Sequence, residues 1–180
     1  MIKVSVFSEE KAWSKRLKNK DIFFKKICMA FPKKYQFSNK KVLFSLLLSN
    51  NKNIKKLNKN FRNKNKSTDI LSFPFNKKIK FSKKMYLGDI IISYNYLNKP
   101  KSQDLELFKQ KTIKIFIHGF LHLLGFDHIK NKDYFKMLRE ENFIYNHVKS
   151  KINSFQKKNL YRVNYFNFTR FLYIIKLTSI

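Results

Sequence analysis

The sequence predicts a single α+β domain in which a small, mixed, four-stranded sheet packs against helices. Its 180 residues suffice for one domain with a buried core, and a content of 43% hydrophobic residues argues against disorder. Four apolar runs have the composition of strands, and segments with helical periodicity separate them in an irregular order, which is typical of α+β domains. No repeat, linker or low-complexity stretch divides the chain into several domains.

The N-terminal segment predicts a strand followed by a long helix. Apolar and polar side chains alternate from Ile2 to Val6, as they do in a half-buried strand. Ser8 is followed by two glutamates and is suited to cap a helix, which we expect to extend to about Phe31. Pro32 then ends this helix, because proline lacks the amide hydrogen that a helix interior needs.

The next segment predicts two further strands with a short helix between them. Residues 42–48 form an apolar run of strand length, and Ser49 or Asn50 begins the helix. Residues 68–74 form a short run rich in strand-forming residues, and Pro74 either ends this strand or places it at a sheet edge. The apolar face of the intervening helix consists of Ile54, Leu57 and Phe61.

A fourth strand and two helices complete the predicted domain. The strand covers residues 87–93, and after Pro100 a helix start is favoured by Ser102, Asp104 and Glu106. The apolar face of this central helix consists of Ile113, Ile117, Phe120, Leu121 and Leu124. We expect the central helix to pack under the sheet and to turn its histidine-bearing edge toward a cleft. Another helix begins at about Lys132.

The central helix ends in the segment 118–128, which contains three of the four histidines and two of the three glycines. His118 and His122 are one helical turn apart, so their imidazoles lie on one face. Gly125 can adopt a positive φ, which ends the helix and lets His128 turn back toward the same point. Three neutral imidazoles leave a fourth position for water on Zn²⁺, which is the arrangement of a catalytic zinc site.

A purely structural role is the alternative for these histidines, because one pair at this spacing is weak evidence of a site. The third histidine favours metal binding. The spacing resembles the metzincin zinc signature, but Gly119 stands where those proteases carry glutamate, so a peptidase would lack its general base. The only cysteine, Cys28, is distant in sequence, and we expect it to be a small buried residue in a reducing compartment.

The charge of the chain indicates a polyanionic partner. It contains 40 lysine and arginine residues against 11 aspartate and glutamate residues, a formal net charge of +29 that is spread along the whole sequence. Such a surface attracts polyanions, and nucleic acid is the obvious one in a cell. The alternative is that a biased, AT-rich coding sequence fills the surface with lysine by drift. The two explanations are equally good for any single lysine, whereas the total favours a partner.

The sequence predicts a cytoplasmic protein without a membrane span. Residues 1–7 run into Glu9 and Glu10 without the long apolar core of a secretory signal. The most apolar stretch, residues 168–180, is interrupted by Arg170 and Lys176 and is too short to cross a bilayer.

Three further motifs precede the histidine segment in a fixed order. They are residues 57–62, residues 67–74, which include Thr-Asp-Ile-Leu-Ser-Phe-Pro, and residues 87–90. Together with the histidine segment they resemble the YbeY family over most of the chain to about residue 150. The resemblance implies one YbeY-like domain over residues 1–150, with residues 151–180 as a basic and aromatic C-terminal extension.

The resemblance implies a metal-dependent endoribonuclease that cleaves single-stranded RNA and acts in 16S rRNA 3′-end maturation and ribosome quality control. Its partners would be rRNA and the ribosome, with no DNA and no membrane. The family's motif histidines bind zinc, which implies one Zn²⁺ on His118, His122 and His128. The resemblance also ties Arg62 to activity; without it, Arg62 is interpreted as an ordinary surface arginine.

The chemistry of these residue types agrees with the implied roles. Zinc lowers the pKa of bound water to about 7, so hydroxide is available at neutral pH even though Gly119 supplies no base. A guanidinium pairs with two phosphate oxygens and counters charge that builds at phosphorus, which makes Arg62 a plausible phosphate clamp.

Other polar residues have simpler interpretations. Asp127 either orients an imidazole or makes an Asx-type turn, and both alternatives stay open. Asp69 and Asp89 are expected to be strand-end or fold residues, and His147 an ordinary polar residue. From Phe155 onward aromatic and basic residues alternate, which suits either stacking on single-stranded RNA or packing on the core, and we favour packing.

Two other functions compete with a nuclease. A non-catalytic, zinc-containing, rRNA-binding ribosome-assembly factor would keep the charge but close the metal site with a fourth protein ligand. A metal hydrolase of proteins or small molecules is the second competitor. Gly119 argues against the peptidase version, and the net charge of +29 argues against a neutral small substrate.

Overall fold

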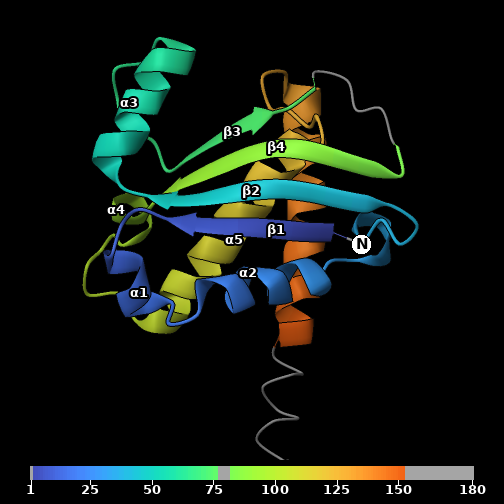
Figure 1. Cartoon of the computed structure of the whole chain (residues 1–180), viewed down its shortest axis with the longest axis horizontal. Coiled ribbons are helices and arrows are strands. Elements are labelled where there is room, and N and C mark those ends of the chain that lie inside the picture. The colour runs from blue at the N-terminus through green and yellow to red at the C-terminus, as the bar shows by residue number, and fades with distance from the viewer. Residues whose placement is uncertain (1, 77–81, 153–180) are drawn as a thin grey trace, which may run out of the picture.

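The computed structural model describes residues 2–76 and 82–152, which form one domain built on a four-stranded sheet (Figure 1). The strand order is β1-β2-β4-β3. β1 (Ile2–Ser8), β2 (Lys41–Ser49) and β4 (Lys84–Ser93) are parallel, and β3 (Ile70–Pro74) pairs antiparallel with β4 at one edge. The predicted α+β fold and its mixed four-stranded sheet are confirmed, and the predicted strand ends agree to within a few residues.

One face of the sheet carries the main hydrophobic core. Alternate side chains of β2 are buried on this face, as the pleat of a strand requires, and they include Phe44 and Leu46. The helices α2 (Lys20–Met29) and α5 (Leu105–Leu123) and the helix over residues 131–152 lie on the same side of the sheet (Figure 1). The predicted packing of the central helix, α5, under the sheet is therefore confirmed.

The other face of the sheet is covered in part by α3 (Asn51–Arg62), which lies near one end of the strands (Figure 1). The side chain of Asn50 accepts a hydrogen bond from the backbone N–H of Asn53 at 3.0 Å, so the helix begins where the sequence predicts. Ile54 packs in a small buried cluster with Leu71 and Ile91. Phe61 departs from the predicted buried face, because it is 67% exposed at the C-terminal end of the helix.

The prediction of one long N-terminal helix was wrong. The chain forms two helices, α1 (Ala12–Arg16) and α2, and the backbone of Leu17 between them is extended. This break lets Leu17 enter the core, where it is 3% exposed, and Asn19 then caps α2 by accepting a hydrogen bond from the N–H of Ile22 at 3.0 Å. Ser8 instead ends β1.

Short elements that the sequence did not predict connect the strands and helices, whereas the start of the central helix agrees with the prediction. α2 ends at Met29, and a turn and the short 3-10 helix η1 (Lys33–Tyr35) lead into β2. A short helix α4 (Tyr94–Leu97) follows β4, and Asp104 caps α5 by accepting from the N–H of Leu107 at 2.6 Å. No helix in the two described ranges is long and apolar enough to cross a membrane.

The structure also bears on the predictions for Cys28 and for the C-terminal extension. Cys28 is 2% exposed, and burial raises the pKa of its thiol, so it is a packed residue rather than a nucleophile. Of the predicted C-terminal extension, only residues 151 and 152 are described, and both are helical. The aromatic and basic residues from Phe155 onward lie outside the described residues.

Candidate metal centre

The C-terminal end of α5 turns sharply at Gly125. This glycine has a φ of 80°, its N–H donates to the carbonyl of His122 at 2.9 Å, and the N–H of Phe126 donates to the carbonyl of Leu121 at 3.1 Å. The two bonds form a Schellman motif, in which a residue in the left-handed region ends the helix. The turn that the sequence predicts at Gly125 is present, and it directs the following residues back toward α5.

The turn brings the three motif histidines together. His118 and His122 lie on the last turns of α5, and one nitrogen from each of these residues and from His128 lies within 4.8 Å of the other two. The ring centroids are 4.7 to 5.3 Å apart. His118 and His122 are partly buried and His128 is exposed, so the group opens to solvent on one side. Three nitrogen donors at these separations form a set that can hold one metal ion.

Two hydrogen bonds orient the imidazoles of His118 and His122 through their Nδ1 atoms. Nδ1 of His118 lies 3.2 Å from a carboxylate oxygen of Glu141, and Nδ1 of His122 lies 2.9 Å from the backbone carbonyl of Phe126. Carboxylate and carbonyl oxygens only accept, so we assign the hydrogen of each ring to Nδ1. The lone pair of each ring then sits on Nε2, which is the nitrogen that faces the other histidines.

The facing nitrogens fit a bound cation. Nε2 of His122 lies 3.1 Å from Nε2 of His118, and with both hydrogens on Nδ1 neither atom can donate to the other. Two lone pairs directed at one point repel each other unless a positive charge lies between them. A zinc ion bound to Nε2, with Nδ1 hydrogen-bonded to a carboxylate or carbonyl, is the usual arrangement of histidine ligands. The residues present therefore fit Zn²⁺.

The electrostatics of His122 favour its neutral form. Burial and, to a lesser degree, the neighbouring His118 together lower its pKa to about 4, although the hydrogen bond to the carbonyl of Phe126 acts in the opposite direction. A metal must displace any proton from its ligand, so a low pKa leaves this imidazole ready to bind at neutral pH.

Glu141 is the residue at this site that sequence reasoning missed. It lies on the helix over residues 131–152, and its partial burial against His118 depends on how that helix packs on α5. The available signal was a carboxylate on the helix that follows the histidine segment. The sequence instead drew attention to Asp127, whose carboxylate accepts from the backbone N–H of His128 at 2.7 Å. The bond joins adjacent residues, whereas an Asx turn joins residues two apart, so both alternatives for Asp127 stay open.

Gly119 stands where a side chain would meet close neighbours. A Cβ atom at this position would lie 2.5 Å from Cδ1 of Ile70 and 3.1 Å from Cγ2 of Ile90, so α5 packs here directly against β3 and β4. A larger residue at position 119 would require these side chains to move. The close contact between helix and sheet therefore favours glycine here.

A cleft with a volume of about 610 Å³ opens over the histidines, and Arg62 lines it together with them. Arg62 ends α3, is exposed, and makes no ion pair with the described part of the chain. Ser72 of β3 also lines the cleft, and its buried hydroxyl has no hydrogen-bond partner among the described residues. The structure therefore places the predicted arginine and the predicted histidines in one cleft.

The other polar residues lie as expected or away from the cleft. Asp69 lines the cleft, but its carboxylate accepts from the hydroxyl of Thr68 and the N–H of Ile70, each at 2.9 Å, at the start of β3. Asp89 accepts from the hydroxyl of Tyr86 at 2.6 Å and does not line the cleft. His147 lies on the helix over residues 131–152, outside the histidine group.

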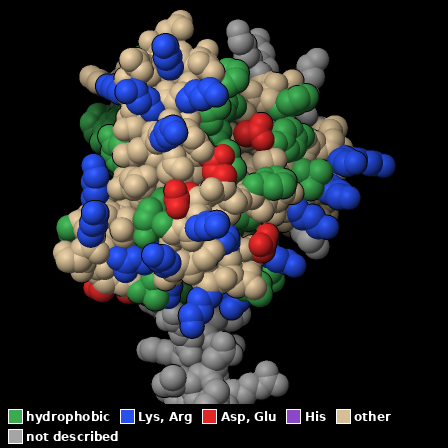
Figure 2. Space-filling view, turned by 60° about the vertical axis from the view of Figure 1, so that its left-hand side comes forward, with side chains coloured by type: hydrophobic (Ala, Val, Ile, Leu, Met, Phe, Trp, Pro, Cys, Tyr) green, Lys and Arg blue, Asp and Glu red, His purple; other side chains and the backbone are tan. Residues whose placement is uncertain are grey.

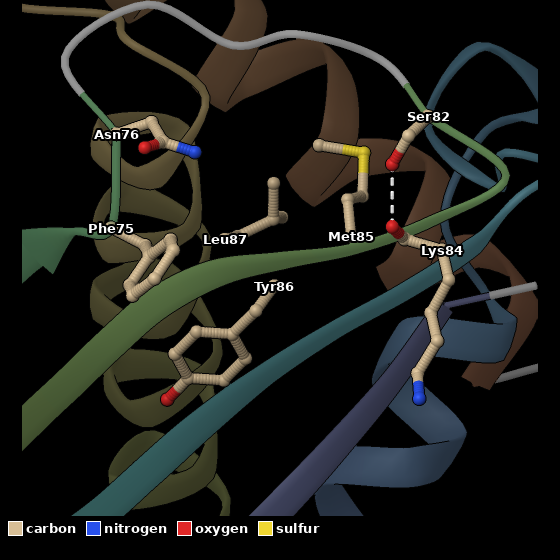
Figure 3. Close-up of a pocket in the computed structure, with 7 residues that line it drawn as sticks. All are labelled: Phe75, Asn76, Ser82, Lys84, Met85, Tyr86 and Leu87. Carbon is tan, nitrogen blue, oxygen red and sulfur yellow. Dashed lines mark hydrogen bonds between the residues drawn. The ribbon is translucent and has the colours of Figure 1, made fainter.

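A second hollow, of about 190 Å³, lies where β3 leaves and β4 enters the sheet (Figure 3). Phe75 and Tyr86 project from the same side of the strands there, with ring centroids 5.7 Å apart. The described residues that line the hollow include no histidine and no carboxylate, so they do not form a second metal site.

Comparison with known proteins relates most of the chain to one family. A family model described as Endoribonuclease YbeY matches residues 7–149. A protein of Pelagibacter ubique (strain HTCC1062) described as Endoribonuclease YbeY is 60% identical over 152 residues, which cover 84% of this chain and 99% of that protein. A protein of Ehrlichia canis (strain Jake) with the same description is 36% identical over 138 residues, which cover 76% of this chain and 86% of that protein.

A solved structure resembles the fold. The solution structure of TM1509 from Thermotoga maritima matches with a TM-score of 0.51 and 24% identity, and the match covers 86% of this chain and 93% of that one. At this level of identity the likeness supports the fold alone.

Proposed function

The chain belongs to the YbeY endoribonuclease family, and on that basis we propose that it is a metal-dependent endoribonuclease that cleaves single-stranded RNA. The observation that carries the proposal is the convergence of three imidazoles and the guanidinium of Arg62, which has no ion pair with the described residues, on a single cleft. We further propose that the substrate is rRNA, in 16S 3′-end maturation and in quality control of ribosomes in the cytoplasm. Family membership is consistent with rRNA processing, and the net charge of +29 supports a polyanionic substrate.

In this proposal His118, His122 and His128 hold one Zn²⁺, which imidazole nitrogens suit well. When bound, the metal lowers the pKa of water and stabilises charge on phosphoryl oxygens. Among the described residues the group contains three side chains and no fourth ligand. A three-ligand set supports catalysis over the non-catalytic assembly factor, for which a closed, four-ligand site is the expectation.

The remaining steps belong to the chain's own side chains. Glu141 and the carbonyl of Phe126 fix the two ring orientations, and burial keeps His122 neutral. Arg62 binds the scissile phosphate with a planar pair of N–H groups and counters the charge that builds on its oxygens. Because Arg62 has no ion pair to give up within the described chain, it is available to the substrate.

A cleavage assay tests this function. Matched single-stranded and double-stranded RNA are incubated with the full chain, with and without a chelator, and His147→Ala serves as a control histidine outside the group. We expect cleavage of the single strand only, loss of activity with the chelator, recovery with added Zn²⁺, and parent activity in His147→Ala. Binding of RNA without cleavage under all conditions would favour the non-catalytic assembly factor instead, and cleavage that survives metal removal would contradict the metal's role.

A further inference from the structure

An aromatic pair lies beside the histidine cleft. Phe61 of α3 is 67% exposed, and its ring lies edge-on to Phe73 of β3 with a centroid separation of 5.3 Å. The next residue after Phe61 is Arg62, which lines the cleft. Ser72 and Pro74, the neighbours of Phe73 in β3, also line the cleft. Since successive side chains of a strand point to opposite faces, the pair sits just across the edge strand from the cleft.

The helix that carries Phe61 is basic and contains no acidic residue. From Asn51 to Lys66 the chain has seven lysine and arginine side chains, all of them exposed, and no aspartate or glutamate; they are Lys52, Lys55, Lys56, Lys59, Arg62, Lys64 and Lys66. Figure 2 shows Lys and Arg side chains gathered over α3 at the top of this face. Lysine is abundant throughout the chain, so this charge alone does not single out a surface. The combination of this charge with an exposed aromatic ring beside the cleft distinguishes α3 from the rest of the basic surface.

We propose that α3 and the aromatic pair Phe61/Phe73 form a docking surface for single-stranded RNA that leads into the cleft. The inference rests on the proposed function and deepens it. Nucleobases stack on the exposed ring of Phe61, the lysines of α3 neutralise the phosphates, and Arg62 receives the backbone where it enters the cleft. A duplex keeps its bases stacked inside and cannot offer them to the ring. The surface thus supplies a physical basis for selecting single strands.

A purely structural role for Phe61 explains its exposure less well than a role in RNA docking. The small cluster under α3 consists of Ile54, Leu71 and Ile91, which are at most 5% exposed, and Phe61 is not among the side chains packed against it, which are Leu47, Leu57 and Phe73. Phe61 adds an edge contact to Phe73 but leaves two thirds of its surface in water. A side chain whose purpose was to seal the cluster would be buried by it.

The test is equilibrium binding of metal-loaded full chain to two nuclease-resistant strands of about 12 nucleotides, within the range of sites for such surfaces. One is a 2′-O-methyl phosphorothioate oligoadenylate, and the other is an abasic strand with the same linkages. The variants are Phe61→Leu, which keeps an apolar contact but no ring, and Phe61→Tyr, which keeps the ring. Phe7→Leu is the matched control, because Phe7 is 59% exposed on β1 at the opposite edge of the sheet.

We expect Phe61→Leu to weaken binding of oligoadenylate about tenfold and to change binding of the abasic strand less than twofold, since only stacking is lost. Phe61→Tyr and Phe7→Leu should bind both strands as the parent does. Parent affinity in Phe61→Leu, or an equal loss for both strands, would overturn the inference; parent affinity is also the result expected if the surface docks a protein.

The two proposals fail in different ways. If the parent protein cleaves no RNA, the proposed function fails, while the binding experiment still measures stacking on Phe61. If the parent cleaves RNA and Phe61→Leu binds oligoadenylate as tightly as the parent, only the docking surface is wrong. Thermal unfolding of each variant checks that the fold is intact, and the affinity of Phe61→Tyr shows whether the ring itself is needed.

Discussion

Nδ1 of His118 lies 3.2 Å from the carboxylate of Glu141, so the helix over residues 131–152 holds the first motif histidine of α5 in place. The bond joins residues 23 apart in the sequence. It fixes both the hydrogen position and the rotation of the ring, and it leaves Nε2 directed at the other histidines. The helix over residues 131–152 is therefore part of the proposed metal site even though it supplies none of the three imidazoles.

Removing the charge of Glu141 should weaken metal binding. Glu141→Gln can still accept a hydrogen bond from His118, but it no longer places a negative charge beside the ring, so we expect Zn²⁺ affinity to fall about 10- to 100-fold. Competition with a chelating dye measures the affinity directly. Glu140→Gln is the control, because Glu140 bonds to Lys34 and Tyr35 rather than to a histidine. An unchanged affinity in Glu141→Gln means that Glu141 does not position the ligand.

Replacing a ligand should remove the metal. His122→Ala leaves two imidazoles, and we expect metal content measured on the purified protein to fall from one ion per chain to nearly none. Stability should fall as well, because metal binding contributes to the free energy of folding. His147→Ala should keep full occupancy. One equivalent of zinc retained by His122→Ala would show that the ligands lie elsewhere.

The metal-free protein should lose stability on acidification. The pKa of His122 is lowered to about 4 by burial and by His118, whereas an unfolded histidine has a pKa of about 6.5. Between these two pH values the unfolded chain binds a proton that the folded chain refuses, so the free energy of unfolding falls as the pH falls through this window. Urea unfolding at several pH values measures the slope, which should be shallower in His122→Gln. Equal slopes in parent and variant would refute this origin of the pH dependence.

Adding one methyl group to α5 should strain its contact with the sheet. Gly119→Ala places Cβ against Ile70 and Ile90, and overpacking of this kind lowers stability by about 1–3 kcal/mol. Thermal denaturation gives the loss, which should accompany reduced metal affinity because α5 carries two of the histidines. A variant as stable as the parent would mean that the helix and sheet can separate here without penalty.

Short-range sequence signals, such as helix caps and turns, predicted most of the fold. The features that they did not predict depend on long-range packing. The caps Asn50 and Asp104 and the turn at Gly125 act within a few residues, so the sequence alone locates them. The break at Leu17 depends on a core that the whole chain builds. The local signal there is Asn19, which caps α2, but an asparagine alone does not separate a new helix start from a position inside one longer helix. The bond from His118 to Glu141 likewise depends on the docking of two helices.

The candidate site shows the same division. The histidine spacing predicted a group that converges, and the structure brings these three side chains together. That Arg62 shares their cleft follows from the sheet, since β3 at the edge brings the end of α3 close to the end of α5. The motif resemblance pointed to Arg62. Composition and periodicity alone gave no reason to prefer Arg62 over any other of the 40 lysine and arginine residues.

The central claim is a division of labour between metal-binding histidines and a phosphate-binding arginine in one cleft. Single-turnover cleavage of single-stranded RNA at saturating protein, with metal measured on the same samples, tests it most directly. Arg62→Ala should keep its zinc and cleave about a hundredfold more slowly or worse, the scale seen when one charge-stabilising donor is removed. Arg62→Lys should recover only part of the rate, because an ammonium lacks the planar fork. Cleavage by Arg62→Ala at the parent rate, or loss of its metal, would contradict the account.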